Sequence, residues 1–324
     1  MALIRSVSIA TEDHGVGSVI MHTGKASDPR AELPHLGSVM AKLLGKEDNP
    51  LPGYIHVTPG ASGGTSQDST FLGPKYSSVT VSDGMPPANL NRPESLNELL
   101  DQQRNILRKH ADDRFMLRRR TAETEAYTQS YDQAAQVMRR QQVFDVSREP
   151  VSLKEKYGTH DFGRHCLLAR RLLENGVTFV KVTHTNYDTH HENFDFHIEQ
   201  IGEFDRTFAT LLDDLHMRGM LESTLVIVMS EFGRTPKINR NYGRDHWGKA
   251  WSVALAGCGI KGGAVIGKTN ANGTAVADRE VNGGHLFHTY LRAVGLNSRK
   301  NHYPQGQPIP MADPKTDAIT EVLA

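Results

Sequence analysis

The stretch Leu225-Val-Ile-Val-Met-Ser-Glu-Phe-Gly-Arg-Thr-Pro236 decides the fold that this sequence predicts. Its apolar start is typical of a buried strand, and the acid, glycine and arginine that follow are typical of a loop at the strand's carboxyl end. Ligands of open α/β sheets bind at that edge. We therefore expect Glu231 and Arg234, with the run Gly243-Arg-Asp-His-Trp247 that follows, to contribute to a functional site.

The segments before this strand indicate alternating helices and strands. Residues 162–174 have apolar side chains at helical spacing and precede an apolar strand at 177–182. A longer helical pattern over 194–215 then leads into the strand at 224–229. This alternation predicts an α/β fold, with a mainly parallel sheet sandwiched by helices in a single domain over 1–324.

Shorter elements are predicted in the rest of the chain. Further strands are expected at 3–9, 54–58, 78–81 and 252–256, and further helices at 13–24, 36–45 and 285–294. The Gly-, Ser- and Pro-rich stretch 59–91 is expected to be mostly a surface loop. Residues 94–143 are heavily charged and free of Gly and Pro, which predicts exposed helices that form a cap or insertion beside the sheet.

The charge balance disfavours a protein that binds polyanions. Lys+Arg and Asp+Glu number 37 each, so the formal net charge is zero and no global field attracts nucleic acid. The four arginines within 114–120 are more typical of a solvated helix face than of a nucleic-acid patch, whose DNA affinity would depend strongly on salt. We therefore expect no nucleic-acid partner.

Membrane insertion is also disfavoured. No apolar run approaches the roughly 20 residues of a spanning helix, and the N-terminus lacks the basic region, apolar core and cleavage site of a signal peptide. We expect no membrane span and no export signal in this chain. Cys166 and Cys258 lie far apart in apolar surroundings and are predicted to be buried free thiols. None of these features predicts the oligomeric state.

The segment Asn186-Tyr-Asp-Thr-His-His-Glu-Asn193 supplies a second group of candidates. Thr189 and Glu192 have the spacing of a capping box, and helix capping would account for both of them. It does not account for Asp188 and His190, because a carboxylate and an imidazole at a strand's carboxyl end are a pair that ligates Zn²⁺ or a similar cation. Helix capping and metal ligation are therefore both open interpretations.

The run after the deciding strand has structural as well as functional interpretations. Glu231 could form a salt bridge with Arg234, and Asp245 could orient a structural His246. However, separate loops bring acids and histidines to what should be one rim of the sheet. This convergence favours a metal site.

An anion would find two kinds of partner at this rim. Arg234 or Arg244 could hold an anionic oxygen bidentately, as phosphate and sulfate groups require. His14, at the front of the helix predicted at 13–24, lies where free backbone amides and the helix dipole favour an anion. A solvated or capping histidine is the alternative at that position.

Several co-linear motifs resemble a bacterial family called domain of unknown function 1501, or DUF1501. They are Tyr157-Gly158, Phe162-Gly163, Leu168-Ala-Arg-Arg-Leu172, Gly176-Val177, Asp188-Thr-His190, Glu231-Phe-Gly-Arg-Thr-Pro236, Gly243-Arg-Asp-His-Trp247 and Gly262-Gly263…Gly267. The resemblance runs through most of 1–296 and is densest over 157–268. Because the family is grouped with the alkaline phosphatase and sulfatase superfamily, the resemblance implies an alkaline-phosphatase-like fold with a metal site at the sheet's carboxyl edge.

The resemblance also implies roles for residues. The implied ligands of one or two divalent ions, Zn²⁺ or else Ca²⁺, Mg²⁺ or Mn²⁺, are Asp188, His190, Glu231 and His246. The stretch His14-Gly-Val-Gly-Ser-Val-Ile-Met-His-Thr-Gly24 resembles the nucleophile helix of sulfatases, with a histidine where the superfamily carries Cys, Ser or Thr. The implied reaction is hydrolysis of a small-molecule or polymeric phosphate or sulfate ester. His14 or a metal-bound hydroxide would be the nucleophile, and Arg234 would stabilise the developing charge.

Two departures from the superfamily pattern affect these expectations. The opening strand of the superfamily ends in an Asp ligand and precedes the nucleophile helix, and no such strand stands before Leu3. Members also resemble exported proteins with a twin-arginine leader, which implies a periplasmic or extracellular location. This sequence shows no such leader. We therefore expect an N-terminally shortened member. Either the gene start is misplaced, the sequence is a fragment, or the protein has lost catalytic competence. A metal-dependent hydrolase is the main hypothesis, and a non-catalytic binding or scaffold protein is the alternative.

Overall fold

The structure is a computed structural model that describes residues 1–47, 49–60, 64–65, 67–82, 93–118 and 122–324. The chain divides into two compact units. The first unit holds Met1–Leu36 and Thr185–Ala324, and the second holds Gly37–His184. The expectation of one domain over 1–324, with a cap or insertion at 94–143, stays a prediction.

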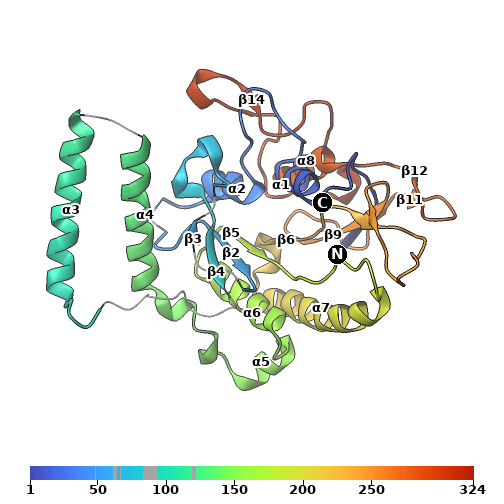
Figure 1. Cartoon of the computed structure of the whole chain (residues 1–324), viewed down its shortest axis with the longest axis horizontal. Helices are drawn as coiled ribbons and strands as arrows, with labels where there is room; N and C mark the ends of the chain where they lie inside the picture. Colours follow the sequence, from blue (N-terminus) through green and yellow to red (C-terminus); the bar gives the residue numbers. More distant parts are fainter. Residues whose placement is uncertain (48, 61–63, 66, 83–92, 119–121) are drawn as a thin grey trace. The chain divides into compact units, whose positions relative to one another are not determined.

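The main sheet of the first unit is mixed. Its order is β10-β1-β9-β6, formed by the strands Val265–Ile266, Ala2–Val7, Trp251–Gly257 and Leu225–Val228. Strand β1 is parallel to β10 and antiparallel to β9, and β6 is antiparallel to β9. Figure 1 shows β6 and β9 beside each other.

The expected mainly parallel sheet is therefore wrong for this sheet. A parallel neighbour needs a crossover connection, which is usually a helix. The connection from β6 to β9 contains only two-residue strands and loops, so the chain returns and pairs antiparallel.

The second unit contains a sheet with parallel pairing. Its sheet has the order β3-β4-β2-β5, formed by Gly64–Thr65, Val79–Ser82, Tyr54–Thr58 and Phe179–Val182. Strand β2 is parallel to both β4 and β5, with Ile55 opposite Val79 on one side and Val180 on the other. The sequence placed β5 and β6 in one parallel sheet, whereas here β5 pairs with β2 and β6 pairs with β9.

The helices follow the expected pattern closely. In the first unit α1, α7 and α8 are His14–Thr23, Asn193–Met217 and Gly283–Ala293. Helices α2 to α6 are Leu36–Leu44, Glu98–Arg118, Ala122–Arg139, Val151–Tyr157 and Asp161–Glu174. Short 3-10 helices are Thr70–Leu72, Pro74–Tyr76, Gln141–Val143, Val146–Arg148, Leu221–Ser223, Pro304–Gly306 and Thr320–Val322.

Small antiparallel pairs complete the first unit. The pair β7–β8 joins Gly233–Arg234 to His246–Trp247, β11–β12 joins Lys268–Thr269 to Val276–Asp278, and β13–β14 joins Asn301–His302 to Ile309–Pro310. The first of these pairs carries two of the expected site residues.

Helix α1 is fixed at both ends by local chemistry. The Asp13 side chain accepts a hydrogen bond from the Val16 amide at 2.9 Å, which caps the first turn. Gly24 closes the helix at φ 79°, and a Cβ there would lie 2.6 Å from the Cβ of Phe287. These two caps confirm the predicted helix and place His14 in its first turn.

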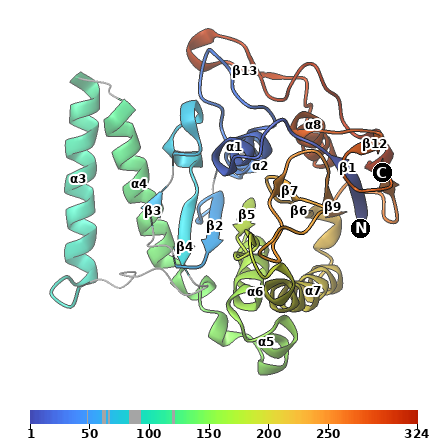
Figure 2. The ribbon, with the colours of Figure 1, turned by 45° about the vertical axis from the view of Figure 1, so that its right-hand side comes forward.

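The charged block of the second unit is helical as predicted. Helices α3 and α4 lie side by side in both views (Figures 1 and 2). Residues 119–121 lie outside the described residues, so the arginine cluster expected there is described only in part. Within the predicted loop at 59–91, residues 61–63, 66 and 83–91 also lie outside them, and the described remainder contains β3, β4 and two short 3-10 helices. Across the part of the chain that is described, no helix is long and apolar enough to cross a membrane.

The two thiols are free, as predicted. Cys166 is buried in α6 beside Leu167 and Leu168, and burial raises the pKa of its thiol. Cys258 is only half-buried, and its thiol donates to the Ala293 carbonyl at 3.4 Å.

Strand β2 carries a titratable group that links folding of the second unit to pH. The Nε2 atom of His56 lies 2.8 Å from the Thr183 hydroxyl. Burial, assisted by the nearby Lys181, lowers the pKa of His56 to about 4. His56 is therefore harder to protonate in the folded state than in the unfolded chain, where its pKa is about 6.5.

We predict that the free energy of unfolding falls by on the order of 2 kcal/mol as the pH drops from about 6.5 to about 4, because protonation favours the unfolded chain in that window. The variant His56→Gln should lose this part of the pH dependence, measured by urea unfolding at several pH values. The variant His110→Gln, on an exposed position of α3, should keep the wild-type slope. Equal slopes for His56→Gln and the wild type would contradict the prediction.

Candidate metal centre

All six predicted site residues lie in the first unit, and each is within hydrogen-bonding or ion-pair distance of another. They come from the start of α1, the segment before α7, the loop after β6 and the β7–β8 pair. The set is His14, Asp188, His190, Glu231, Arg234 and His246.

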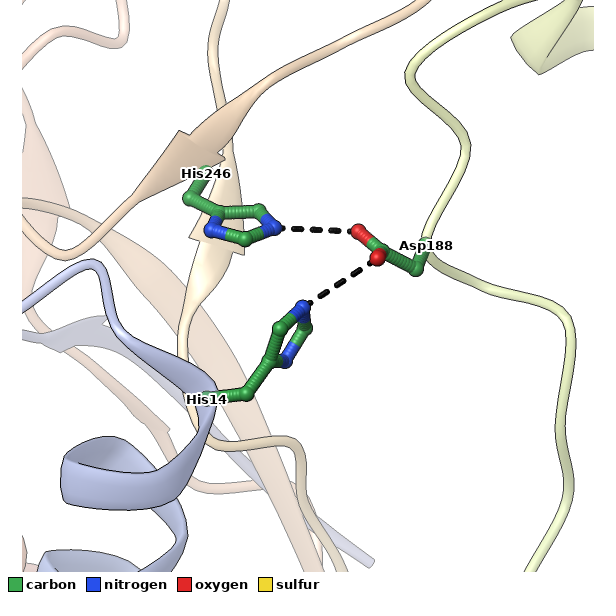
Figure 3. Close-up of side chains that lie close together, drawn as sticks. All are labelled: His14, Asp188 and His246. Atoms are coloured by element: carbon green, nitrogen blue, oxygen red, sulfur yellow. Dashed lines mark hydrogen bonds and ion pairs between the residues drawn. The ribbon is translucent and has the colours of Figure 1, made fainter.

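The carboxylate of Asp188 lies at the centre of this set. Its Oδ1 atom is 3.0 Å from Nε2 of His190 and 3.0 Å from Nε2 of His246. The same oxygen is 2.6 Å from Nη1 of Arg234. Its Oδ2 atom is 3.2 Å from Nε2 of His14, and Figure 3 shows His14 and His246 both pointing toward the Asp188 carboxylate. Burial opposes ionisation, but the hydrogen bond from the Arg234 guanidinium holds the pKa of Asp188 well below its usual range.

The β7–β8 pair explains why an arginine and a histidine reach the same carboxylate. Arg234 and His246 are directly opposite each other in the antiparallel register. Opposite residues of such a pair have neighbouring side chains. Gly233 allows β7 to lie close to Trp251, because a Cβ at position 233 would be 2.7 Å from the Cβ of Trp251.

His14 is held by Glu231 on its other side. Nδ1 of the ring lies 2.6 Å from Oε1 of Glu231. Burial opposes the charge on each partner, but hydrogen bonding outweighs it, so the pKa of His14 is raised and that of Glu231 is lowered. The Glu231–Arg234 salt bridge considered from the sequence is not the arrangement found, because Arg234 pairs with Asp188.

Each of the three site histidines has its Nδ1 atom against an oxygen. His14 faces Glu231 at 2.6 Å, His190 faces Oδ1 of Asp245 at 2.8 Å, and His246 faces the carbonyl of Glu12 at 2.7 Å. A carbonyl oxygen only accepts, so His246 must carry its proton on Nδ1. Hydrogen bonds from His190, and then from Asn239, hold the pKa of Asp245 below its usual value.

A neutral imidazole that carries its proton on Nδ1 has no proton at Nε2 to donate to Asp188. With its proton on Nδ1, neutral His246 presents a lone pair at Nε2, 3.0 Å from both Asp188 Oδ1 and His190 Nε2. A cation or an additional proton between these atoms removes the repulsion. Ligand atoms of His14, Asp188 and His246 all lie within 4.8 Å of one another. Imidazole nitrogens and a carboxylate oxygen are the donors that Zn²⁺ and similar ions take, so the residues present fit a divalent cation.

A backbone clasp joins the two loops that supply these groups. The loop over 239–245 is bonded along the segment over 189–193 by Glu192 N to Asn241 O at 3.1 Å, Asn193 N to Tyr242 O at 3.0 Å and Arg244 N to Thr189 O at 2.9 Å. The Asn239 amide also donates to the carbonyl of His190 at 2.9 Å. A Cβ on Gly243 would lie 2.0 Å from the carbonyl carbon of His190, so only glycine fits at this contact.

The predicted capping box is wrong. Glu192 is the N-cap of α7 with φ 46° and makes no side-chain capping bond, and the Thr189 hydroxyl donates to the side-chain oxygen of Asn193 at 2.7 Å. The clasp already takes up the amides of Glu192 and Asn193. Helix capping therefore does not explain this segment.

Sequence reasoning missed some supporting groups. Asp245 was expected to orient its neighbour His246, but it bonds His190. The Glu12 carbonyl leaves no signal in a sequence, because every residue has one. Arg244, one of the two candidate anion-binding arginines, donates to the carbonyls of Thr235 and Pro236 and so holds the loop.

The fold and the site together define an α/β protein with a histidine–carboxylate cluster suited to a divalent cation. Over residues 1–323 the chain matches the family model described as Protein of unknown function (DUF1501), and it belongs to that family. Comparisons with curated proteins and with solved structures give no match.

We predict that Gly243→Ala lowers the free energy of unfolding by about 1–3 kcal/mol, because the added methyl group must push the clasped loops apart. Urea unfolding would measure the loss. The matched control is Gly202→Ala on α7, where a Cβ meets nothing within 4 Å. It should stabilise the protein by up to about 1 kcal/mol through helix propensity. An unchanged midpoint for Gly243→Ala would contradict the tight contact.

Proposed function

We propose that this chain is a metal-dependent hydrolase-like protein that acts on phosphate or sulfate esters, with a divalent cation held beside Asp188, His190 and His246. One observation carries the proposal. Two imidazole nitrogens and a guanidinium nitrogen, from separate segments, converge within 3.0 Å of one carboxylate oxygen, Asp188 Oδ1. Such convergence is typical of a ligand-binding centre and is not needed for the stability of a loop.

The residues around the cation have separable roles in this proposal. When bound, a divalent ion would supply Lewis-acid polarisation of an ester oxygen and a water of lowered pKa. Asp188 and the two histidines hold it, and Arg234 balances the Asp188 charge at a position where it can also meet an anionic ester oxygen. Glu231 reaches this centre through its bond to His14.

The resemblance to the alkaline phosphatase and sulfatase superfamily supports the finer parts of the proposal. These are an alkaline-phosphatase-like fold, a Zn²⁺, Ca²⁺, Mg²⁺ or Mn²⁺ ion, and a small-molecule or polymeric ester as substrate. The family resemblance also supports export to the periplasm or the outside of the cell.

A second candidate function is a non-catalytic binding or scaffold protein that keeps the fold. The observation that favours it is the pairing of every charged group in the cluster. Arg234 neutralises Asp188 at 2.6 Å, and the raised pKa of His14 lets a proton take the place of a cation between Asp188 and Glu231. In that case the cluster is an ion-pair network that fixes the loops.

We predict that purified wild-type protein binds Zn²⁺ or Mn²⁺ and hydrolyses p-nitrophenyl phosphate or sulfate. Asp188→Asn should lower kcat/KM by at least about 100-fold, because loss of a ligand exceeds the 10–100-fold cost of losing a supporting residue. Metal binding is measured by calorimetry and hydrolysis by absorbance.

The matched control is Asp205→Asn, which makes the same change on an exposed position of α7 and should behave as wild type. Two results would overturn the enzyme proposal: a wild-type protein that binds no metal, or hydrolysis that Asp188→Asn leaves intact. Metal binding without hydrolysis would favour the scaffold function.

A further inference from the structure

The three histidines around Asp188 share one arrangement. Each ring has Nδ1 against an oxygen acceptor and Nε2 toward the Asp188 carboxylate. We propose that His14 is a third imidazole ligand of the cation, and that Glu231 and Asp245 are positioning residues that act through His14 and His190. The inference rests on the proposed function, and it replaces the roles of His14 as nucleophile and Glu231 as direct ligand.

The position of His14 supports ligation. Its Nε2 atom is 3.2 Å from Asp188 Oδ2, and one ligand atom each from His14, Asp188 and His246 fit within 4.8 Å. Metal bonds of about 2.0–2.1 Å place ligand atoms roughly 3–4 Å apart. The His14 side chain therefore needs only a small shift to share a cation with Asp188 and His246.

The surroundings of His14 argue against a nucleophile. Both of its ring nitrogens face carboxylates, Glu231 at 2.6 Å and Asp188 at 3.2 Å. The ring also packs against Phe232, with centroids 4.9 Å apart, and edge-on against His246 at 4.3 Å. With Nδ1 protonated, the lone pair at Nε2 of His14 faces the same carboxylate as that of His246, and a cation bound there would take up both.

The oxygens of Glu231 are already engaged. Oε1 accepts from His14 at 2.6 Å, and Oε2 accepts from the Ser230 hydroxyl at 3.2 Å. A carboxylate that accepts from Nδ1–H of a ligating imidazole fixes its tautomer and raises its basicity. Glu231 therefore acts on the cation through His14.

Asp245 has the same relation to His190. Its Oδ1 atom accepts from His190 Nδ1 at 2.8 Å and from the Asn239 amide at 3.0 Å. Because Asn239 donates to the His190 carbonyl as well, one amide ties the backbone of the histidine to the carboxylate that orients its ring. The two acids thus form matched carboxylate–imidazole pairs on two sides of Asp188.

Nuclear magnetic resonance of protein with ¹⁵N-labelled histidine tests the ligand set directly. Long-range ¹H–¹⁵N spectra, assigned with single His→Gln variants, report which ring nitrogen carries the proton. We expect Nδ1–H tautomers for His14, His190 and His246 in the presence of Zn²⁺, and a Zn²⁺-dependent shift of each Nε2. His22, whose Nδ1 donates to the Ser18 carbonyl at 2.8 Å, is the internal reference and should not shift.

Zn²⁺ affinity, measured by competition with a chelating dye, tests the positioning residues. Glu231→Gln and Asp245→Asn should each weaken binding by about 10–100-fold while all three Nε2 shifts persist. His14→Ala should weaken it further, and free imidazole should restore part of the loss. Glu280→Gln, which changes an exposed acid bonded to Ser8, should bind as wild type. Circular dichroism checks that each variant is folded.

The outcomes separate this inference from the proposed function. If Zn²⁺ shifts no histidine of the wild type, the proposed function fails. If Zn²⁺ shifts His190 and His246 but not His14, the metal centre stands and the inference is overturned. The inference is also overturned if His14→Ala loses hydrolysis with unchanged Zn²⁺ affinity, because His14 would then act on the substrate alone.

Discussion

The first unit is organised around the charge of Asp188. The Asp188 carboxylate is about half exposed, yet Arg234 pairs with it at 2.6 Å and three imidazoles approach it as well. These partners come from three parts of the chain. The positions of α1, of the β7–β8 pair and of the segment before α7 are therefore linked through this one group.

The clasp between 189–193 and 239–245 gives that group a fixed place. Backbone hydrogen bonds hold the two loops so close together that no side chain fits at Gly243. Asn239 adds a side-chain tie between the His190 backbone and the Asp245 carboxylate. A site on loops gains the rigidity that is otherwise supplied by strands and helices, and this rigidity is what metal or anion recognition requires.

Helices and several strands could be predicted because their signals are local. Asp13 and Gly24 mark both ends of α1, and apolar spacing marks α6 and α7. The pairing of strands could not be predicted in the same way. Strand β6 is a continuous apolar run, as in a parallel sheet, yet it pairs antiparallel with β9. Which strand lies beside another depends on contacts between residues far apart in the chain, and the local patterns of a single sequence do not reveal these contacts.

The sequence by itself determined which residues have the chemistry for the site, since His14, Asp188, His190, Glu231, Arg234 and His246 were all identifiable by residue type and position. Only the tertiary structure decided which residue meets which. Asp245 orients His190 across 55 positions of sequence and not its neighbour His246, and Glu231 bonds His14 and not Arg234. The physical reason is that hydrogen bonds act over about 3 Å in space, and the folded loops bring together groups that the chain keeps far apart.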